Sequence, residues 1–153
     1  MDYGSSAFIL RPAAQADFPA IRALIHAVGI NPTGLDWRRF LIAVTPEGRL
    51  VGCGQVKPHR GGARELASIA VVPGMRGKGV ARAVIDRLLE DQNEELYLTC
   101  RASLAPFYNK FGFRSAQAAE LPHYFRAVRR FAGAIQRLGI MDEGLLVMKR
   151  DIN

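Results

Sequence analysis

The sequence predicts an α/β fold. Segments rich in apolar and β-branched residues alternate along the chain with segments whose apolar residues recur at helical spacing. One such alternation, from Glu65 to Cys100, contains a strand, a glycine-rich loop, a helix and a strand, which is a βαβ-like unit. The length of 153 residues, of which 49% are hydrophobic and 23% charged, suits one compact domain over residues 1–153.

Strands and helices are expected in alternation through the first half of the chain. Asp17 is the expected N-cap of the first helix, and Gly29 is expected to end it. The turn Pro46-Glu47-Gly48 joins two of the strands into a hairpin. The expected strands are Ala7–Arg11, Leu41–Thr45 and Leu50–His59, and the expected helices are Phe18–Val28 and a short one over Leu35–Phe40.

The second half continues this pattern. Ser103 is the expected N-cap of a short helix ending at Gly112, and Pro122 suits the first turn of a last helix that ends at Gly139. The last helix is expected to bury one stripe, formed by Tyr124, Val128, Phe131, Ile135 and Leu138. The other expected elements are strands over Glu65–Val72, Glu95–Cys100, Phe113–Ala116 and Glu143–Arg150, and a helix from Val80 to Asp91.

Several classes of protein are disfavoured by composition. No apolar run is long enough to span a bilayer, and the N-terminus lacks a basic-then-apolar secretory pattern, so we expect a cytoplasmic protein without a membrane partner. Cys53 and Cys100 lie in apolar strands, where buried thiols are the first interpretation and a disulfide is the alternative. The three histidines are scattered, so we expect no metal.

The net charge of +7 is compatible with nucleic acid, an anionic membrane or a polyanionic small molecule. No aromatic ladder accompanies the basic residues, which ranks nucleic acid last. The last helix carries basic residues away from its apolar stripe, and a solvated face, a lid and a homodimer contact all remain open for it. These basic residues are Arg126, Arg129, Arg130 and Arg137.

A glycine-rich loop, Arg76-Gly77-Lys78-Gly79, opens the helix that starts at Val80. Free amides, the helix dipole and two cations together favour a phosphate-bearing ligand. The spacing from Gly74 to Gly77 is too short for a Walker loop, and Arg82 stands where a dinucleotide loop needs glycine. The alternative is a plain strand-to-helix turn that uses glycine for tightness.

The segment from Val72 to Ala81 resembles the acetyl-CoA loop of the GCN5-related N-acetyltransferases (GNAT), and the segment Phe107-Tyr108-Asn109-Lys110-Phe111-Gly112-Phe113 is similar to a later part of that family. The resemblance implies a mixed, mostly antiparallel central sheet flanked by helices, and acetyl-CoA as co-substrate. It implies that the backbone of Ile69, Ala70 and Val71 pairs with the pantetheine arm. The residues implied to hold the pyrophosphate are Arg76, Gly77, Lys78, Gly79, Val80 and Ala81.

Acetyl transfer to an amine needs a neutral nucleophile and a hydrogen-bond donor for the departing thiolate. By resemblance, Tyr108 is the expected general acid and Glu65 the expected general base. A packing tyrosine and an exposed strand-end glutamate paired with an arginine such as Arg64 are the respective alternatives. Arg101 stands where the family often has asparagine, and it is expected to reach a cofactor phosphate or a substrate carboxylate.

The acceptor is expected against residues 31–40, where Trp37 would form a wall and Arg38 or Arg39 would hold a carboxylate. A core tryptophan and solvated arginines are the alternative. The expected acceptor is a primary amine on a small metabolite, such as an amino acid, or on a protein or peptide. Segments around Gly52-Cys53-Gly54 and Glu65–Val72 resemble small stand-alone N-acetylglutamate synthases. A non-catalytic acyl-CoA sensor or interaction module is the competing hypothesis.

Overall fold

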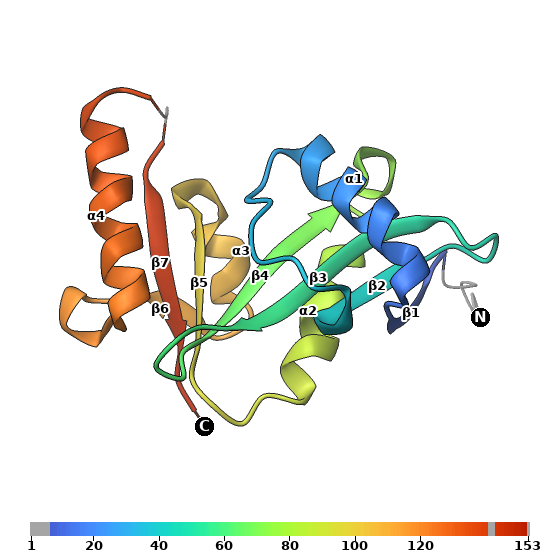
Figure 1. Cartoon of the computed structure of the whole chain (residues 1–153), viewed down its shortest axis with the longest axis horizontal. Coiled ribbons are helices and arrows are strands. Elements are labelled where there is room, and N and C mark those ends of the chain that lie inside the picture. The colour runs from blue at the N-terminus through green and yellow to red at the C-terminus, as the bar shows by residue number, and fades with distance from the viewer. Residues whose placement is uncertain (1–6, 141–142, 153) are drawn as a thin grey trace. The chain divides into compact units, whose positions relative to one another are not determined.

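The computed structural model describes residues 7–140 and 143–152, and within them it has one mixed sheet and four α-helices (Figure 1). The strands are β1 (Ile9–Pro12), β2 (Phe40–Val44), β3 (Leu50–Pro58), β4 (Arg64–Val71), β5 (Leu96–Arg101), β6 (Phe113–Ser115) and β7 (Leu145–Arg150). The α-helices are α1 (Phe18–Val28), α2 (Val80–Glu90), α3 (Ala105–Asn109) and α4 (His123–Arg137).

The strands pair in the order β1-β2-β3-β4-β5-β7-β6. The pairs β1–β2, β2–β3, β5–β7 and β6–β7 are antiparallel, and β4–β5 is parallel. The predicted mixed, mostly antiparallel sheet flanked by helices is therefore confirmed. The chain forms two compact units, one from the chain up to Lys57 with Ala67–Asp91, the other from Pro58–Leu66 with the chain from Gln92 onward. Each unit is described separately.

In the first unit, helices cover both faces of the sheet. Alternate residues of β2 point to opposite faces: Phe40, Ile42 and Val44 pack against Ile21 and Ile25 of α1. Leu41 and Ala43 join the α2 side, where Val80 and Val84 are fully buried. Because both faces are covered, all five residues of β2 are buried, which explains its continuous apolar run.

Helix α2 lies unusually close to β3 because two glycines of β3 face it. A Cβ built on Gly52 would stand 2.5 Å from Cγ1 of Val80. One built on Gly54 would stand 2.5 Å from Cδ1 of Ile69 and 2.9 Å from Cγ1 of Val84. No real Cβ contact is that short, so any larger residue would displace the helix or its side chains. These glycines therefore set the position of α2.

In the second unit, α4 packs beside β5 and β7, as its place next to β7 in Figure 1 indicates. Phe125 is fully buried and shares a cluster with Leu121, Tyr97 and Val147. The predicted stripe of this helix is partly wrong. Phe131 and Leu138 are 67% and 75% exposed, because the buried line instead runs through Phe125 and Ala132, one residue further along the helix.

Two predicted helix caps are corrected. Asp17 occupies the N-cap position of α1, but its carboxylate accepts hydrogen bonds from Arg11 and from the backbone N–H of Ala14 and does not cap α1. Ser103 lies inside a 3₁₀ turn, Ala102–Leu104, and its hydroxyl donates to Glu143, so the N-cap of α3 is Leu104. The short helix expected over 35–40 is a 3₁₀ turn at Trp37–Arg39, whose backbone N–H at Arg38 is capped by Asp36.

We expect Gly52→Ala to lower the free energy of unfolding by about 1–3 kcal/mol, because the new methyl group must displace Val80 at the start of α2. Urea denaturation followed by circular dichroism measures the change. Gly133→Ala in α4 is the matched control: its Cβ meets nothing within 4 Å, so higher helix propensity should raise stability by up to about 1 kcal/mol. A Gly52→Ala protein as stable as the parent would contradict the packing argument.

Candidate functional site

The start of α2 presents unsatisfied backbone amides. Gly77 and Gly79 have φ angles of 76° and 80°, a left-handed conformation that favours glycine. Gly79 is the N-cap residue of α2, and no side chain caps that end. Arg76 and Lys78 are exposed, and neither has an ion-pair partner among the described residues. The loop therefore combines free N–H donors, the positive end of a helix and two available cations, which together suit a phosphate group.

The side chain of Val80 anchors this loop and leaves only its backbone for a ligand. Val80 is 1% exposed and packs among Met75, Val51 and Val84. Ala81 is half-buried one residue further into the helix. A ligand at this loop would therefore contact Val80 through its backbone and not through its side chain.

The end of β4 sends its side chains into two separate cores. Ile69 and Val71 pack on the α2 side, whereas Ala70 packs on the α1 side. Just before them, Ser68 has a φ of 60°, the only positive value at a non-glycine position among the described residues. Residues in this conformation cost of order 1–3 kcal/mol and cluster at functional sites. The Ser68 hydroxyl accepts a hydrogen bond of 2.9 Å from Nε2 of Gln55 on β3.

A buried polar cluster lies between β3 and the 31–39 segment of the first unit. Gln55 is fully buried, and its Nε2 donates to the Gly34 carbonyl as well as to Ser68, while its Oε1 has no partner. Arg39 donates from Nη2 to the same Gly34 carbonyl at 3.2 Å, and its buried Nε has no partner. Lys57 is 6% exposed and packs against Gly34. The cluster therefore retains one orphaned acceptor and one orphaned donor.

The two predicted acceptor residues lie at the surface side of this segment. Trp37 is half-buried, and the Arg38 guanidinium lies 5.2 Å from the centre of its ring. Arg38 is 71% exposed and pairs with Asp36. Of the two arginines considered from the sequence, Arg39 is the one directed into the protein.

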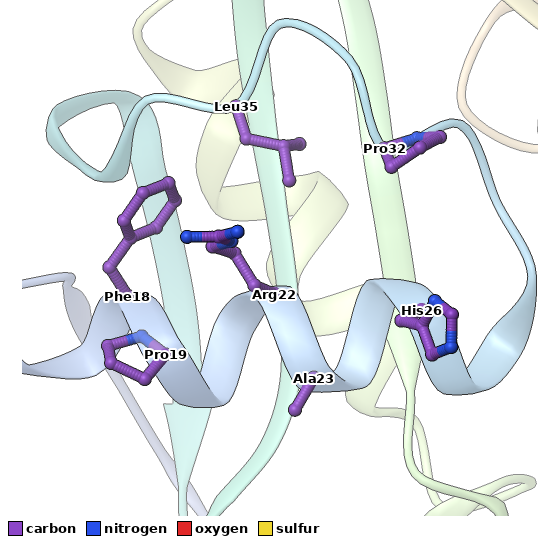
Figure 2. Close-up of a pocket in the computed structure, with 7 residues that line it drawn as sticks. All are labelled: Phe18, Pro19, Arg22, Ala23, His26, Pro32 and Leu35. Atoms are coloured by element: carbon purple, nitrogen blue, oxygen red, sulfur yellow. The ribbon is translucent and has the colours of Figure 1, made fainter.

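A groove of about 550 Å³ runs between α1 and the 32–35 segment (Figure 2). Figure 2 shows Arg22 rising from α1 between Phe18 and Leu35, and His26 opposite Pro32 at the other end. The Arg22 guanidinium lies 5.5 Å from the centre of the Phe18 ring. None of the described residues that line the groove carries a carboxylate, so its ionisable groups favour anions.

Tyr108 lies on α3 in the second unit, wedged among aromatic rings. Its ring makes edge contacts with Phe107 and Phe113 at centroid distances of 5.1 and 6.3 Å. Burial, and secondarily the nearby Cys100 thiol, raise the pKa of Tyr108 to about 12. Its hydroxyl has no hydrogen-bond partner among the described residues. Tyr108 is thus a phenol that keeps its proton at neutral pH and has that proton available to donate.

Glu65 is buried, contrary to the alternative of an exposed strand-end glutamate. It is 7% exposed on β4 and lies opposite Tyr97 of β5. Its Oε1 stands 2.7 Å from Nε2 of His59, and the His59 ring stacks on Tyr124 of α4 with centroids 3.9 Å apart. The structure therefore joins Glu65 to a histidine that the sequence analysis left unassigned.

Arg101 is exposed at the end of β5, beside the carboxylate of Glu143. Hydrogen bonds from the hydroxyl and the backbone N–H of Ser103, together with the charge of Arg101, lower the pKa of Glu143. Arg101 thus has an acidic neighbour within its own unit. Contact with a cofactor phosphate stays a prediction for this residue.

Other expectations concern cysteines, metals and membranes. Cys53 and Cys100 are free and buried, and burial raises the pKa of their thiols to about 12 and about 11, so the first interpretation of both is confirmed. Over residues 7–140 and 143–152, no cluster of three or more metal-ligating side chains occurs. None of the helices in that part of the chain has the length and apolar character needed to cross a membrane.

The residues missed from the sequence are His59, Gln55 and Ser68. Signals for two of them were present: His59 and Glu65 flank one tight turn, and Gln55 is a polar residue inside an apolar strand. The positive φ of Ser68 and the inward direction of Arg39 depend on packing, which no local pattern encodes.

Comparison with known proteins agrees with this geometry. A family profile described as acetyltransferase (GNAT) domain matches residues 36–115. An amino-acid acetyltransferase of Mycobacterium tuberculosis is 32% identical over 92 residues, which are 54% of this chain and 53% of that protein. The chain thus spans about half the length of this curated relative.

Solved structures share the fold. N-acetylglutamate synthase from Neisseria gonorrhoeae, complexed with coenzyme A and L-arginine, has a TM-score of 0.72 at 21% identity, over 97% of this chain and 34% of that one. Rv2747 from Mycobacterium tuberculosis, in a complex that contains CoA, has a TM-score of 0.70 at 21% identity, over 95% of this chain and 99% of that one. At such identities the likeness shows the fold alone. The profile match covers more than half of the chain and includes the glycine-rich loop and Tyr108, so this chain belongs to the GNAT acetyltransferase family.

Proposed function

We propose that residues 1–153 act as one N-acetyltransferase domain that transfers an acetyl group from acetyl-CoA to the primary amine of an amino acid. The observation that carries the proposal is the start of α2, where uncapped amides, left-handed glycines and two available cations follow β4. The amino-acid acetyltransferase relative supports the acceptor class, since its match to this chain is a sequence match above 30% identity.

The residues present fit acetyl-CoA. The amides of residues 76–81 would hold the pyrophosphate, with Arg76 and Lys78 adding charge. The backbone of Ile69, Ala70 and Val71 would hydrogen-bond the amide-bearing arm in the manner of an added strand. Arg101 is proposed to approach a phosphate or a carboxylate. Acetyl-CoA, when bound, supplies the acetyl group as a thioester.

The buried polar cluster supports an amino acid as the acceptor. An orphaned buried donor or acceptor costs about 1–3 kcal/mol, and a ligand that satisfies it recovers that cost. Oε1 of Gln55 would accept a hydrogen bond from an amino group, and Nε of Arg39 would donate one to a carboxylate. An α-amino acid carries both groups. Trp37 and Arg38 would border this acceptor on the surface side.

Two residues of the second unit are proposed for proton transfer. Glu65 would take a proton from the attacking amine, directly or through water, because a carboxylate accepts protons and the amine must be neutral to react. Tyr108, protonated because its pKa is about 12, would donate a hydrogen bond to the departing thiolate. A phenol with that pKa is a weaker acid than an ordinary thiol, whose pKa is about 8.5, so hydrogen bonding is favoured over complete proton transfer.

The first test is calorimetric titration with acetyl-CoA and, separately, ATP. The parent should bind acetyl-CoA and not ATP, and Gly79→Ala should bind it about tenfold or more weakly, because a left-handed alanine costs roughly 1–2 kcal/mol. Gly74→Ala is the matched control, since its Cβ meets nothing within 4 Å and its φ is not left-handed. Absence of acetyl-CoA binding by the parent at low salt would refute the proposal and reduce the loop to a structural turn.

Tyr108→Phe should lower kcat by roughly 10–100-fold while the Kd for acetyl-CoA changes little, because the ring and its packing remain and only the donor is lost. Thiol release measured under saturating acetyl-CoA gives kcat, and calorimetry gives Kd. Phe107→Leu, a neighbour on the same helix without a hydroxyl, controls for disturbed packing. An unchanged kcat in Tyr108→Phe would assign the tyrosine a packing role only.

Arg39→Gln should raise the KM for the amino acid by roughly 10–100-fold, since a charge-assisted hydrogen bond is worth about 1.5–3 kcal/mol. The KM for acetyl-CoA should stay near that of the parent. Arg49→Gln, an exposed arginine at the β2–β3 turn, is the matched control. Each amino acid is assayed beside its α-carboxamide, and equal turnover of acid and amide would exclude carboxylate recognition.

A further inference from the structure

Helix α4 has a second apolar line that faces solvent. Of the six large apolar side chains that are exposed in the described part of the chain, three lie here: Phe131, Leu138 and Ile140 are 67%, 75% and 68% exposed. The N–H of Ile140 donates to the Ile135 carbonyl at 3.2 Å, so the chain folds back beside the last turn of the helix. Exposed apolar side chains that cluster in this way mark interaction sites, whereas scattered ones do not.

The exposed line has the spacing of a coiled-coil seam. Its residues follow one another in steps of four, three and four, which is the a/d repeat by which two helices pack side by side; they are Ala127, Phe131, Ala134 and Leu138. The large side chains alternate with alanines, which leave space for the side chains of a second helix. On one flank of this seam, Val128 packs on the core cluster of the second unit. The seam therefore has one free flank and is wide enough for one further helix.

The free flank of the seam is basic. Arg130 and Arg137 each directly precede a large residue of the seam, at the positions that face the charged residues of a partner helix in coiled coils. Both are exposed, and neither makes an ion pair with any described residue. The sequence from His123 to Arg137 contains no aspartate or glutamate. The positive charge of α4 is therefore not balanced within the helix.

We propose that this seam binds an acidic amphipathic helix of a partner protein. Apolar residues of that helix would pack against Phe131 and Leu138, and its carboxylates would pair with Arg130 and Arg137. None of these four residues is among those proposed for acetyl transfer, so the interaction surface and the proposed function stand or fall separately.

Charge and shape select this occupant. Two copies of the chain that paired antiparallel through α4 would set Arg130 and Arg137 of one copy against the same arginines of the other, and like charges at these positions oppose pairing. A helix that lies in a membrane surface has a broad face of large apolar residues. Here two of the four seam residues are the small Ala127 and Ala134. A partner helix with acidic flanks meets neither difficulty.

The probes are three fluorescein-labelled synthetic peptides, each three heptads long. One has leucine at a and d and glutamate at e and g, one has lysine in place of glutamate, and one has the composition of the first in scrambled order. Fluorescence anisotropy measures the Kd of each peptide for the parent and its variants. The parent should bind the acidic peptide at least about tenfold more tightly than either of the others, because only this peptide has both the seam and the complementary charge.

Phe131→Ser should weaken binding of the acidic peptide by about tenfold or more, because a large buried side chain is lost from the contact. Arg130→Gln combined with Arg137→Gln should weaken it roughly two- to tenfold and reduce its dependence on salt. The matched controls are Ile9→Ser, at an exposed apolar residue of the first unit, and Arg49→Gln; both should bind as the parent does. Circular dichroism and calorimetry with acetyl-CoA establish that each variant is folded.

Several outcomes would overturn the assignment. Equal affinity of the parent for the acidic and scrambled peptides would exclude the seam, and so would a folded Phe131→Ser protein with the parent's Kd. Should Phe131→Ser fail to fold, the arginine double variant decides. Flotation with vesicles of equal parts phosphatidylserine and phosphatidylcholine, without peptide binding, would assign the surface to a membrane. A dimer in sedimentation velocity that Phe131→Ser dissociates would assign it to a second copy.

Discussion

Helix α2 can lie against β2 and β3 only because Gly52 and Gly54 place no side chain between them. That close contact buries Val80 and Val84 and thereby fixes where the helix begins. The unsatisfied amides and the positive end of the dipole lie at the start of the helix. The packing of two glycines on β3 therefore controls the position of the loop that is proposed to bind the pyrophosphate. The geometry of the proposed cofactor site thus depends on a steric constraint in the core.

The same strand, β3, also contains a buried polar residue. Burying an unpaired polar atom costs free energy that an apolar residue at the same position would not cost. Gln55 is fully buried with an unsatisfied oxygen, and it is held by Ser68, whose backbone is in a left-handed conformation. Arg39 adds an unsatisfied nitrogen. Buried polar groups are normally all paired, and backbone strain persists only where the surroundings enforce it. The unpaired polar atoms of Gln55 and Arg39 and the strained backbone of Ser68 occur in one cluster around Gly34, in the segment where an acceptor is proposed.

In the second unit, aromatic rings pack around the polar side chains that are proposed for proton transfer. Phe125 and Tyr124 follow one another on α4 and confine His59, which in turn holds Glu65. Phe107 and Phe113 contact the Tyr108 ring edge-on, and burial raises the pKa of its phenol to about 12. In both places apolar rings restrict the orientation of a polar side chain.

The sequence by itself determined the order of elements, the fold class, the family and the glycine-rich loop, because these depend on local periodicity, on glycine spacing and on residues adjacent in the chain. Only the tertiary structure decided which of Arg38 and Arg39 turns inward, that Glu65 is buried beside His59, and that Phe131 faces solvent. The physical reason is that side-chain direction and burial follow from neighbours distant in sequence. Helix α4 has apolar residues on two adjoining lines. The residues that pack on the helix, and not its own pattern, decide which of the two lines is buried.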